Sequence, residues 1–378
     1  TKNGGESWSN VTPKNLPDWT MINSIEPSAF DAGTCYVAGT KYKTGDFKPY
    51  LYKTTDYGKS WSKITNGIHE EHFTRVLRED PANKNILYAG TETGIYISFN
   101  AGKSWNEFQL NLPIVPITDL TIKNNSLVVA TQGRSLWMID DLTVLHQSYI
   151  NSLNRKQLTY HDLQNVELFT PKDSYRTSGS KTTRNNLTEG ENIDNGVVTY
   201  FNIKNYNDKD EVTLTYLNNS RDTIVSFGNN FSGKQKLKLQ KGANKFSWNM
   251  YHDGATDFEG MILWWASLSG PKAVPGEYFV DLNVNGQVTS KTFNILIDPR
   301  SESSISEMQE QFNFISAINE TVDKAHKSIK KLRNIKVQLS KFIKEYSKKD
   351  LNELIDKAST LEAKLSDIEK ELYQTQNR

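Results

Sequence analysis

The stretch TTDYGKSW at residues 54–61 decides the architecture of this chain, because it is repeated. Residues 1–8 read TKNGGESW and residues 98–105 read SFNAGKSW, so all three copies fit the pattern S/T-x-D/N-x-G-x-S-W. The copies begin 53 and 44 residues apart. Repetition every 40 to 50 residues or so is typical of β-propellers, in which each repeat forms one four-stranded blade.

The octapeptide has the chemistry of a β-hairpin turn. Its Asp or Asn side chain can accept hydrogen bonds from backbone N–H groups two residues further on, and its Gly allows a positive φ. Its Trp leads the next strand, where it packs between neighbouring sheets. The residues that we assign to these structural roles are Asn3, Trp8, Asp56, Gly58, Trp61, Asn100, Gly102 and Trp105.

The flanking residues support a propeller. Residues 87–98 read as a strand, a glycine-containing turn and a second strand, while residues 126–131 and 135–140 read as inner strands of a last blade. We therefore predict about three blades over residues 1–150, preceded by one outer strand. Closed propellers have four to eight blades, so we expect further N-terminal blades outside this chain.

The middle of the chain is predicted to be a linker followed by a second β domain. Residues 151–195 are largely polar and lack a hydrophobic period, which indicates a linker. Residues 196–300 hold short apolar strands separated by Asn, Asp and Gly turns. The pair Asn285-Gly286 predicts a two-residue hairpin. Strands at this spacing predict an Ig-like β-sandwich.

Residues 301–378 change to a helical period. Ser304 and Glu307 form a capping box, which marks the start of the first helix. A short connection predicts a second, antiparallel helix, and thus a coiled-coil-like helical hairpin. Two helices bury one seam, so a third helix, the sandwich or a partner must cover the rest. The seam of the second helix is Leu351, Leu354, Ala358, Leu361, Leu365, Ile368 and Leu372.

The bulk composition excludes several classes of function. The chain has 378 residues, of which 36% are hydrophobic and 24% are charged, and its net charge is +1. We therefore expect a globular protein with no nucleic-acid partner. A single cysteine cannot form a disulfide within the chain. No stretch has the ~18 to 20 apolar residues of a membrane span, so none is predicted.

Few residues qualify as site candidates. Arginines near blade strands could hold an anionic ligand, although ion pairs between blades explain them better. The run HEEH at residues 69–72 does not have the spacing of zinc peptidases, so we predict no metal and no cofactor. No catalytic set is identified. The ligand-binding candidates are Arg134, Arg75, Arg78 and His72.

The octapeptide is identified as the Asp box, or bacterial neuraminidase repeat, which both sialidases and sortilin-type receptors carry. The stretches at residues 49–61, 72–81, 129–137 and 270–278 resemble a family of bacterial exported proteins with a sortilin-type propeller, commonly labelled glycosyl hydrolase. The resemblance covers nearly the whole chain, but its motifs do not fix the chemistry. It implies the cell surface, extracellular space or periplasm of a Gram-negative bacterium, and the Lys/Asn-rich composition suits a Bacteroidota member.

Two hypotheses for function follow. The first is a binding or scaffold module of an envelope complex, with protein partners, the missing N-terminal propeller half, or a glycan or peptide as ligand. The alternative is a sialidase-like glycosidase or other hydrolase, whose active site lies in the propeller channel and partly outside this chain.

Overall fold

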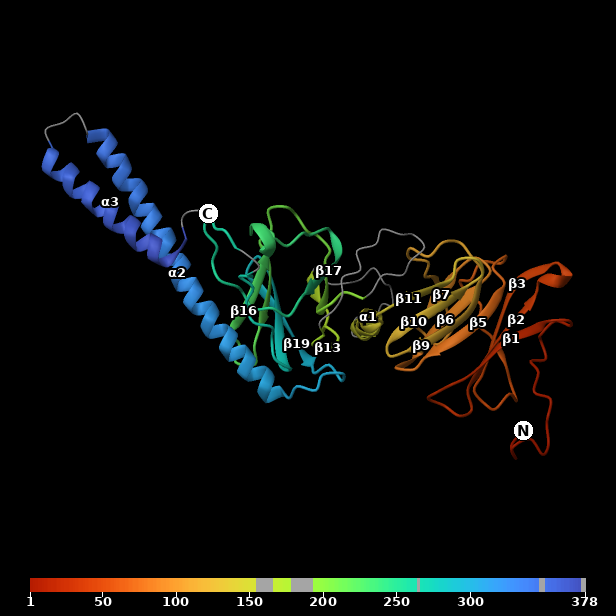
Figure 1. Cartoon of the computed structure of the whole chain (residues 1–378). Helices are drawn as coiled ribbons and strands as arrows, with labels where there is room; N and C mark the ends of the chain where they lie inside the picture. The colour runs from red at the N-terminus through yellow and green to blue at the C-terminus, as the bar shows by residue number, and fades with distance from the viewer. Residues whose placement is uncertain (154–165, 178–192, 264–265, 347–350, 375–378) are drawn as a thin grey trace. The chain divides into compact units, whose positions relative to one another are not determined.

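The computed structural model describes residues 1–153, 166–177, 193–263, 266–346 and 351–374, and the chain divides into two compact units (Figure 1). Unit 1 spans Thr1–Gln164 and unit 2 spans Asn165–Arg378. Unit 1 is built of three sheets and one α-helix, and unit 2 of two sheets and two long α-helices. The prediction of a mainly β chain with a helical tail is therefore confirmed.

Unit 1 contains three antiparallel meanders in chain order. A short 3₁₀ helix, η1 (Tyr42–Thr44), lies between the second and third strands. The strands of the first sheet are β1 (Met21–Pro27), β2 (Cys35–Lys41), β3 (Asp46–Thr54) and β4 (Ser62–Lys63). Those of the second are β5 (Thr74–Asp80), β6 (Asn83–Thr91), β7 (Ile95–Ser98) and β8 (Asn106–Glu107). Those of the third are β9 (Ile117–Lys123), β10 (Ser126–Thr131) and β11 (Leu136–Ile139).

Buried apolar clusters join successive sheets. Tyr36 and Leu51 of the first sheet pack with Leu77 and Leu87 of the second. Side chains of the second sheet then pack in the same way with Leu120 and its neighbours in the third. Up-and-down sheets that pack in chain order are the arrangement of propeller blades.

The three octapeptides form the same turn, with one difference from the prediction. The Asp or Asn side chain accepts a hydrogen bond from a backbone N–H four residues on, not two. The backbone N–H of the Asp or Asn itself donates to the hydroxyl of the octapeptide's first residue, two positions earlier. That hydroxyl also accepts the Gly N–H, because the residue before the Gly has a positive φ, which turns the chain back towards the hydroxyl. The four-residue bonds are Ser7 N to Asn3, Ser60 N to Asp56 and Ser104 N to Asn100, at 3.1, 2.9 and 2.9 Å.

The Trp residues of the second and third copies are tied to the preceding repeat, whereas Trp8 donates to Gly5 of its own copy. The Trp61 indole Nε1 donates to the Val11 carbonyl at 2.7 Å, and Trp105 donates to the Ile64 carbonyl at 2.7 Å. Each acceptor lies three residues after the Trp of the preceding copy. Trp105 is 3% exposed, whereas Trp8, the Trp of the first copy, is 77% exposed. The prediction that the Trp packs between sheets thus holds for Trp105 but not for Trp8.

A helix follows the third sheet. α1 (Thr143–Leu153) buries Leu145 and Tyr149 in the cluster that joins the second and third sheets. The polar sequence around it did not predict a helix. In the first two sheets the chain continues from the third strand to a fourth, whereas in the third sheet it continues from β11 to α1.

Unit 2 has two sheets around one apolar core. Asn285 and Gly286 have φ values of 53° and 86°, so the predicted two-residue hairpin is confirmed. The immunoglobulin-like topology stays a prediction. One sheet has the strands β12 (Val166–Leu168), β14 (Val197–Ile203) and β17 (Gly242–Trp248). The other has β13 (Ser174–Tyr175), β19 (Gln287–Leu296), β18 (Gly276–Val284), β15 (Val212–Leu217) and β16 (Thr223–Gly228).

The range 151–195 differs from the predicted linker. β12 pairs with β14, and β13 pairs with β19. Leu168 and Phe169 are buried, and this gain outweighs the polar character of the surrounding sequence. Residues 154–165 and 178–192 of the predicted linker lie outside the described residues.

The tail is the predicted antiparallel helical hairpin. α2 (Ile305–Tyr346) begins with the expected capping box, in which Glu307 accepts from Ser304 N at 2.7 Å. α3 (Asn352–Leu372) runs antiparallel to α2. Two hydrogen bonds show the direction, since Ser340 bonds Glu362, and Arg333, earlier on α2, bonds Glu369, later on α3. No helix in the described part of the chain has both the length and the apolar character that crossing a membrane requires.

The seam of α3 is only partly buried. Ala358 is buried, but Leu354, Leu361 and Ile368 are exposed to between 45% and 50%. The reason is the 4% exposed Glu369, whose carboxylate accepts from Arg333 and Lys336 of α2. These bonds turn a polar edge of α3 towards α2 and leave part of the apolar seam outside.

The segment after β17 docks α2 onto the sheets of unit 2. The His252 ring stands edge-on to Phe312 at 4.8 Å, and Thr256 N donates to Asp323 at 2.9 Å. Phe258 packs between His326, in the middle of α2, and Tyr373, at the C-terminal end of α3, so it contacts both helices. The β domain of unit 2 therefore covers part of the helical surface, which is one of the three predicted alternatives.

Trp105→Phe is expected to lower the free energy of unfolding by about 1 to 3 kcal/mol, because the buried Ile64 carbonyl loses its donor. Urea denaturation measures this change. Trp8→Phe is the matched control, and its effect should stay within about 0.5 kcal/mol because Trp8 is exposed. Equal effects at the two positions would contradict the inter-repeat role of the Trp.

Acid is expected to destabilise unit 2 through His252, whose pKa burial lowers to about 4 from the ordinary 6.5. Because the pKa is depressed in the folded state, the unfolded chain binds the proton first as the pH falls. The stability that neutral His252 contributes is thus complete above pH 6.5 and is lost between pH 6.5 and 4. Partial exposure of the ring keeps the loss below about 3 kcal/mol.

The measurement is urea unfolding of the wild type and His252→Phe near neutral pH and near the lower limit of that window. The difference between the two proteins should shrink or reverse in acid, because Phe has no proton to bind. A constant difference across the window would mean that His252 does not couple pH to stability.

Candidate functional site

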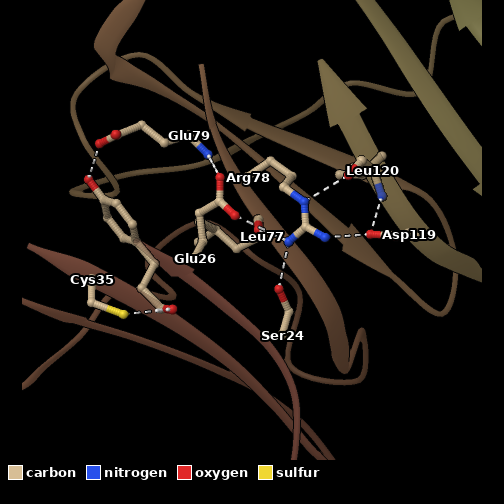
Figure 2. A network of polar contacts seen from close by, with 9 residues as sticks. Ser24, Glu26, Cys35, Leu77, Arg78, Glu79, Asp119 and Leu120 are labelled. Atoms are coloured by element: carbon tan, nitrogen blue, oxygen red, sulfur yellow. Dashed lines mark hydrogen bonds and ion pairs between the residues drawn. The ribbon is translucent and has the colours of Figure 1, made fainter. Parts of the chain in front are cut away.

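Arg78 in the middle of β5 connects the first strands of all three sheets (Figure 2). Its Nη1 donates to Ser24 Oγ on β1 at 2.8 Å and lies 3.5 Å from the Glu26 carboxylate. Its Nη2 donates to Asp119 on β9 at 2.7 Å, and its Nε donates to the Leu120 carbonyl at 2.8 Å. The guanidinium is therefore an ion-pair bridge between consecutive sheets, with two carboxylates from different strands.

Glu79 extends this network into the first sheet. Its carboxylate accepts from the Tyr36 hydroxyl at 3.0 Å and from the Ser28 hydroxyl and Ala29 N–H of the β1–β2 turn at 2.7 and 2.9 Å. Its backbone N–H donates to Glu26 at 3.4 Å (Figure 2). Burial, together with the Glu79 charge, raises the pKa of Tyr36, so the hydroxyl stays protonated as the donor.

Asp80 ties α1 to β5. The fully buried carboxylate contacts His146 Nε2 at 2.9 Å and accepts from the Tyr88 hydroxyl at 3.1 Å and Ala82 N at 2.8 Å. Burial acts to raise the pKa of Asp80, but these hydrogen bonds outweigh it and the pKa is lowered. The carboxylate is thus a structural anion and not a proton donor.

The sheets share a common end. Thr74, the first residue of β5, donates through Oγ1 to the carbonyls of Gly39 and Tyr50, at the end of β2 and in β3. β5 therefore begins beside the β2–β3 loop of the first sheet. We call the end at which β1, β5 and β9 begin the upper end of unit 1.

The upper end carries a cluster of aromatic and charged side chains. Tyr42 and Phe73 stack with their ring centroids 5.0 Å apart, and the Arg75 guanidinium lies 5.7 and 5.3 Å from these rings. Arg75 also forms an ion pair with Glu92 at 2.6 Å. Phe47 adds an exposed ring 6.1 Å from Phe73. Like the Arg78 network, in which the Asp119 side chain is 61% exposed, this cluster is partly open to solvent.

The remaining candidates are placed separately. His72 Nδ1 contacts the Tyr96 hydroxyl at 2.8 Å, and burial and the neighbouring His69 lower the pKa of His72. Arg134 is exposed in the β10–β11 turn, where its Nη1 donates to the adjacent Gly133 carbonyl. Within the described residues, His, Cys, Asp and Glu side chains form no group of three that could hold a metal ion.

The structure does not gather the predicted arginines into an anion site. Arg75 and Arg78 lie on the same strand but bond different carboxylates. The partners Glu26 and Asp119 were missed from the sequence. Glu26 lies 18 residues after Trp8, the offset that Glu79 has from Trp61, so an alignment of the repeats gives no signal for the pairing of Glu26 with Arg78.

Comparisons with known proteins give low similarity. No family model matches the chain. No curated protein matches it. Among solved structures, an ancestral GH74 enzyme has a TM-score of 0.25 at 22% identity, over 30% of this chain and 14% of its own. The GH74 enzyme of Niastella koreensis has a TM-score of 0.27 at 12% identity, over 48% and 26%.

YCF48 from Cyanidioschyzon merolae has a TM-score of 0.27 at 16% identity, over 37% of this chain and 45% of its own. The chain thus spans less than half the length of each of these three proteins. Scores at this level assign neither fold nor activity, so the account of unit 1 depends on its own strands and contacts.

Arg78→Met is expected to lower the free energy of unfolding by about 2 to 4 kcal/mol, because it leaves the half-buried Glu26 without its counter-charge. Chemical denaturation measures the effect. Arg134→Met is the matched control and should change the value by at most about 0.5 kcal/mol. The double variant Arg78→Met/Glu26→Gln should be less destabilised than the sum of the single variants. Simple additivity would argue against the bridge.

Proposed function

We propose that this chain is part of a binding or scaffold module. The observation that carries the proposal is the Arg78 network. Arg78 uses four of its five N–H donors on Ser24, Leu77, Leu120 and Asp119. An arginine held in this way has little capacity to bind a substrate anion, and its carboxylate partners serve as structural anions between the sheets.

The upper end is the proposed ligand face. It has exposed large apolar side chains, because Trp19 and Ile114, just before β1 and β9, are 87% and 81% exposed. Phe47 and the Arg75–Glu92 pair lie at the same end. Exposed apolar side chains that gather on one surface mark interaction sites. The proposed ligands are a protein partner, such as the remaining propeller blades or an envelope subunit, or a peptide or glycan.

The setting of this module follows the sequence resemblance. We propose an exported protein at the cell surface, outside the cell or in the periplasm of a Gram-negative bacterium of the Bacteroidota, within the sortilin-type Asp-box family. An Ig-like unit 2 and its helical hairpin would dock the propeller to the partner. The hairpin's half-exposed seam at Leu354, Leu361 and Ile368 supports such a role.

One observation favours the alternative of a glycosidase. Burial raises the pKa of Glu26, although Arg78 opposes the shift. A raised pKa is what a general acid needs, and the exposed Asp119 stands on the other side of Arg78 as a second carboxylate. In this reading the two carboxylates act from β1 and β9, on either side of β5, together with residues outside this chain.

The binding proposal predicts that Phe47→Ser weakens ligand binding at least about tenfold, because it removes the exposed ring of the upper end. Peptide and glycan arrays identify a bound class, and titration of one member gives the dissociation constant. Phe30→Ser is the matched control, since Phe30 is an exposed ring in the β1–β2 turn at the opposite end. Equal loss in both variants, or no binding on either array, would contradict the proposal.

The same preparations decide between binding and hydrolysis. We expect no turnover of glycan or peptide substrates by the chain. Turnover that disappears in both Glu26→Gln and Asp119→Asn would instead establish the glycosidase alternative.

A further inference from the structure

Among the described residues, the outer edge of β11 has no neighbouring strand, unlike the equivalent strands of the other two sheets. β3 pairs with β4, and β7 pairs with β8. In these two sheets, the residue three positions after the octapeptide Trp donates its N–H to a carbonyl on the outer edge of the third strand, β3 or β7. Ile64 N donates to the Leu51 carbonyl at 2.9 Å, and Phe108 N donates to the Ile95 carbonyl at 2.8 Å. β11 is the last strand of its sheet in the described part of the chain.

The hairpin register shows which backbone groups of β11 face this open edge. Thr131 N donates to the Ser135 carbonyl at 3.1 Å, just as Thr91 N donates to the Gly94 carbonyl at 2.8 Å in the second sheet. Leu136 therefore corresponds to Ile95. Because antiparallel backbone groups alternate in direction, the N–H and C=O groups of Leu136 and Met138 point away from β10. No described residue donates to or accepts from them.

The side chains of β11 make this edge suited to pairing. Leu136 and Met138 are 69% and 55% exposed on one face, while Trp137 and Ile139 pack against the apolar cluster on the other. Natural edge strands are protected by charged residues, prolines or bulges. β11 has the sequence LWMI and a regular register, so it has none of these. α1 packs into the same cluster through Leu145 and Tyr149.

Charges at the ends of β11 define the direction and chemistry of a partner strand. Arg134 precedes β11 and Asp140 follows it, and both are exposed. An antiparallel partner begins beside Asp140 and ends beside Arg134. We propose that the β11 edge binds an extended segment of another polypeptide as a fourth strand, with an apolar stretch followed by an acidic residue or free carboxylate that faces Arg134. The β11 edge belongs to the third sheet and Phe47 to the first, so Phe47→Ser tests the ligand face without altering this edge, and the two proposals stand or fall independently.

Hydrogen exchange on the whole chain tests whether the edge is open. Ile97 is the matched residue, because it occupies the position of Met138 in β7 and pairs with Asn106 of β8. The Met138 amide should exchange about a hundredfold faster than the Ile97 amide. Equal protection of the two amides would show that the edge is already closed and would overturn the proposal.

Peptide binding tests the strand addition itself. The probe is a fluorescein-labelled peptide with the sequence of residues 103–110, KSWNEFQL, and a free C-terminal carboxylate; this is the segment that completes the second sheet. Fluorescence anisotropy should show saturable binding and slower exchange at Met138. Methylation of the peptide's Phe nitrogen should weaken binding at least about tenfold, because it removes the N–H that would donate to Leu136.

Variants of the chain complete the test. Met138→Pro should weaken binding at least about tenfold while the protein stays folded, since a proline is tolerated on a strand edge. Leu136→Lys serves as a second variant, and Phe314→Lys on α2, at a side chain of the same 69% exposure, is its control. Arg134→Glu should weaken the binding of the free-acid peptide but not the binding of the same peptide with a C-terminal amide. Absence of saturable binding, or binding unchanged by both N-methylation and Met138→Pro, overturns the proposal.

Discussion

Three consecutive charged residues on β5 hold unit 1 together. Arg78 reaches β1 on one side and β9 on the other, Glu79 is held by Tyr36 and the β1–β2 turn, and Asp80 is held by His146 of α1. Charges that are removed from water need partners, so each of these contacts fixes the position of a different element. One strand thereby specifies how three sheets and a helix are arranged.

The octapeptide adds a second, repeating constraint. Its turn is closed by bonds among its own residues, so each copy forms the same local structure. Its Trp then bonds a carbonyl of the preceding repeat, so the position of each blade depends on the blade before it. The first copy and the last sheet stand outside this pattern, and they leave Trp8 and the β11 edge exposed.

These constraints bear on function. The charged groups of β1, β5 and β9 are engaged with one another, which supports the proposed binding or scaffold role. The surfaces left for recognition are apolar and aromatic, or are backbone edges. The proposed recognition of partners is therefore by shape and by strand pairing more than by charge, in keeping with the net charge of +1.

What the sequence determined by itself is the part of the structure that depends on neighbours within a few residues. The box turns, the Asn285-Gly286 hairpin and the Ser304–Glu307 cap all form as predicted in place, because their bonds close within a short stretch of chain. The donor to the box side chain was predicted less well, since two consecutive residues of positive φ bring an N–H four residues on, and not two, to the carboxylate or amide.

Only the tertiary structure decided what becomes of identical local patterns. Trp8 and Trp105 end the same octapeptide, yet one is exposed and the other is buried, because burial depends on whether a preceding repeat is packed against the Trp. Arg78 could not be assigned from sequence to an ion-pair bridge, because Asp119 and Glu26 lie 41 and 52 residues away and reach it only after the sheets have packed. Contacts between distant residues depend on that packing, which a local pattern does not encode.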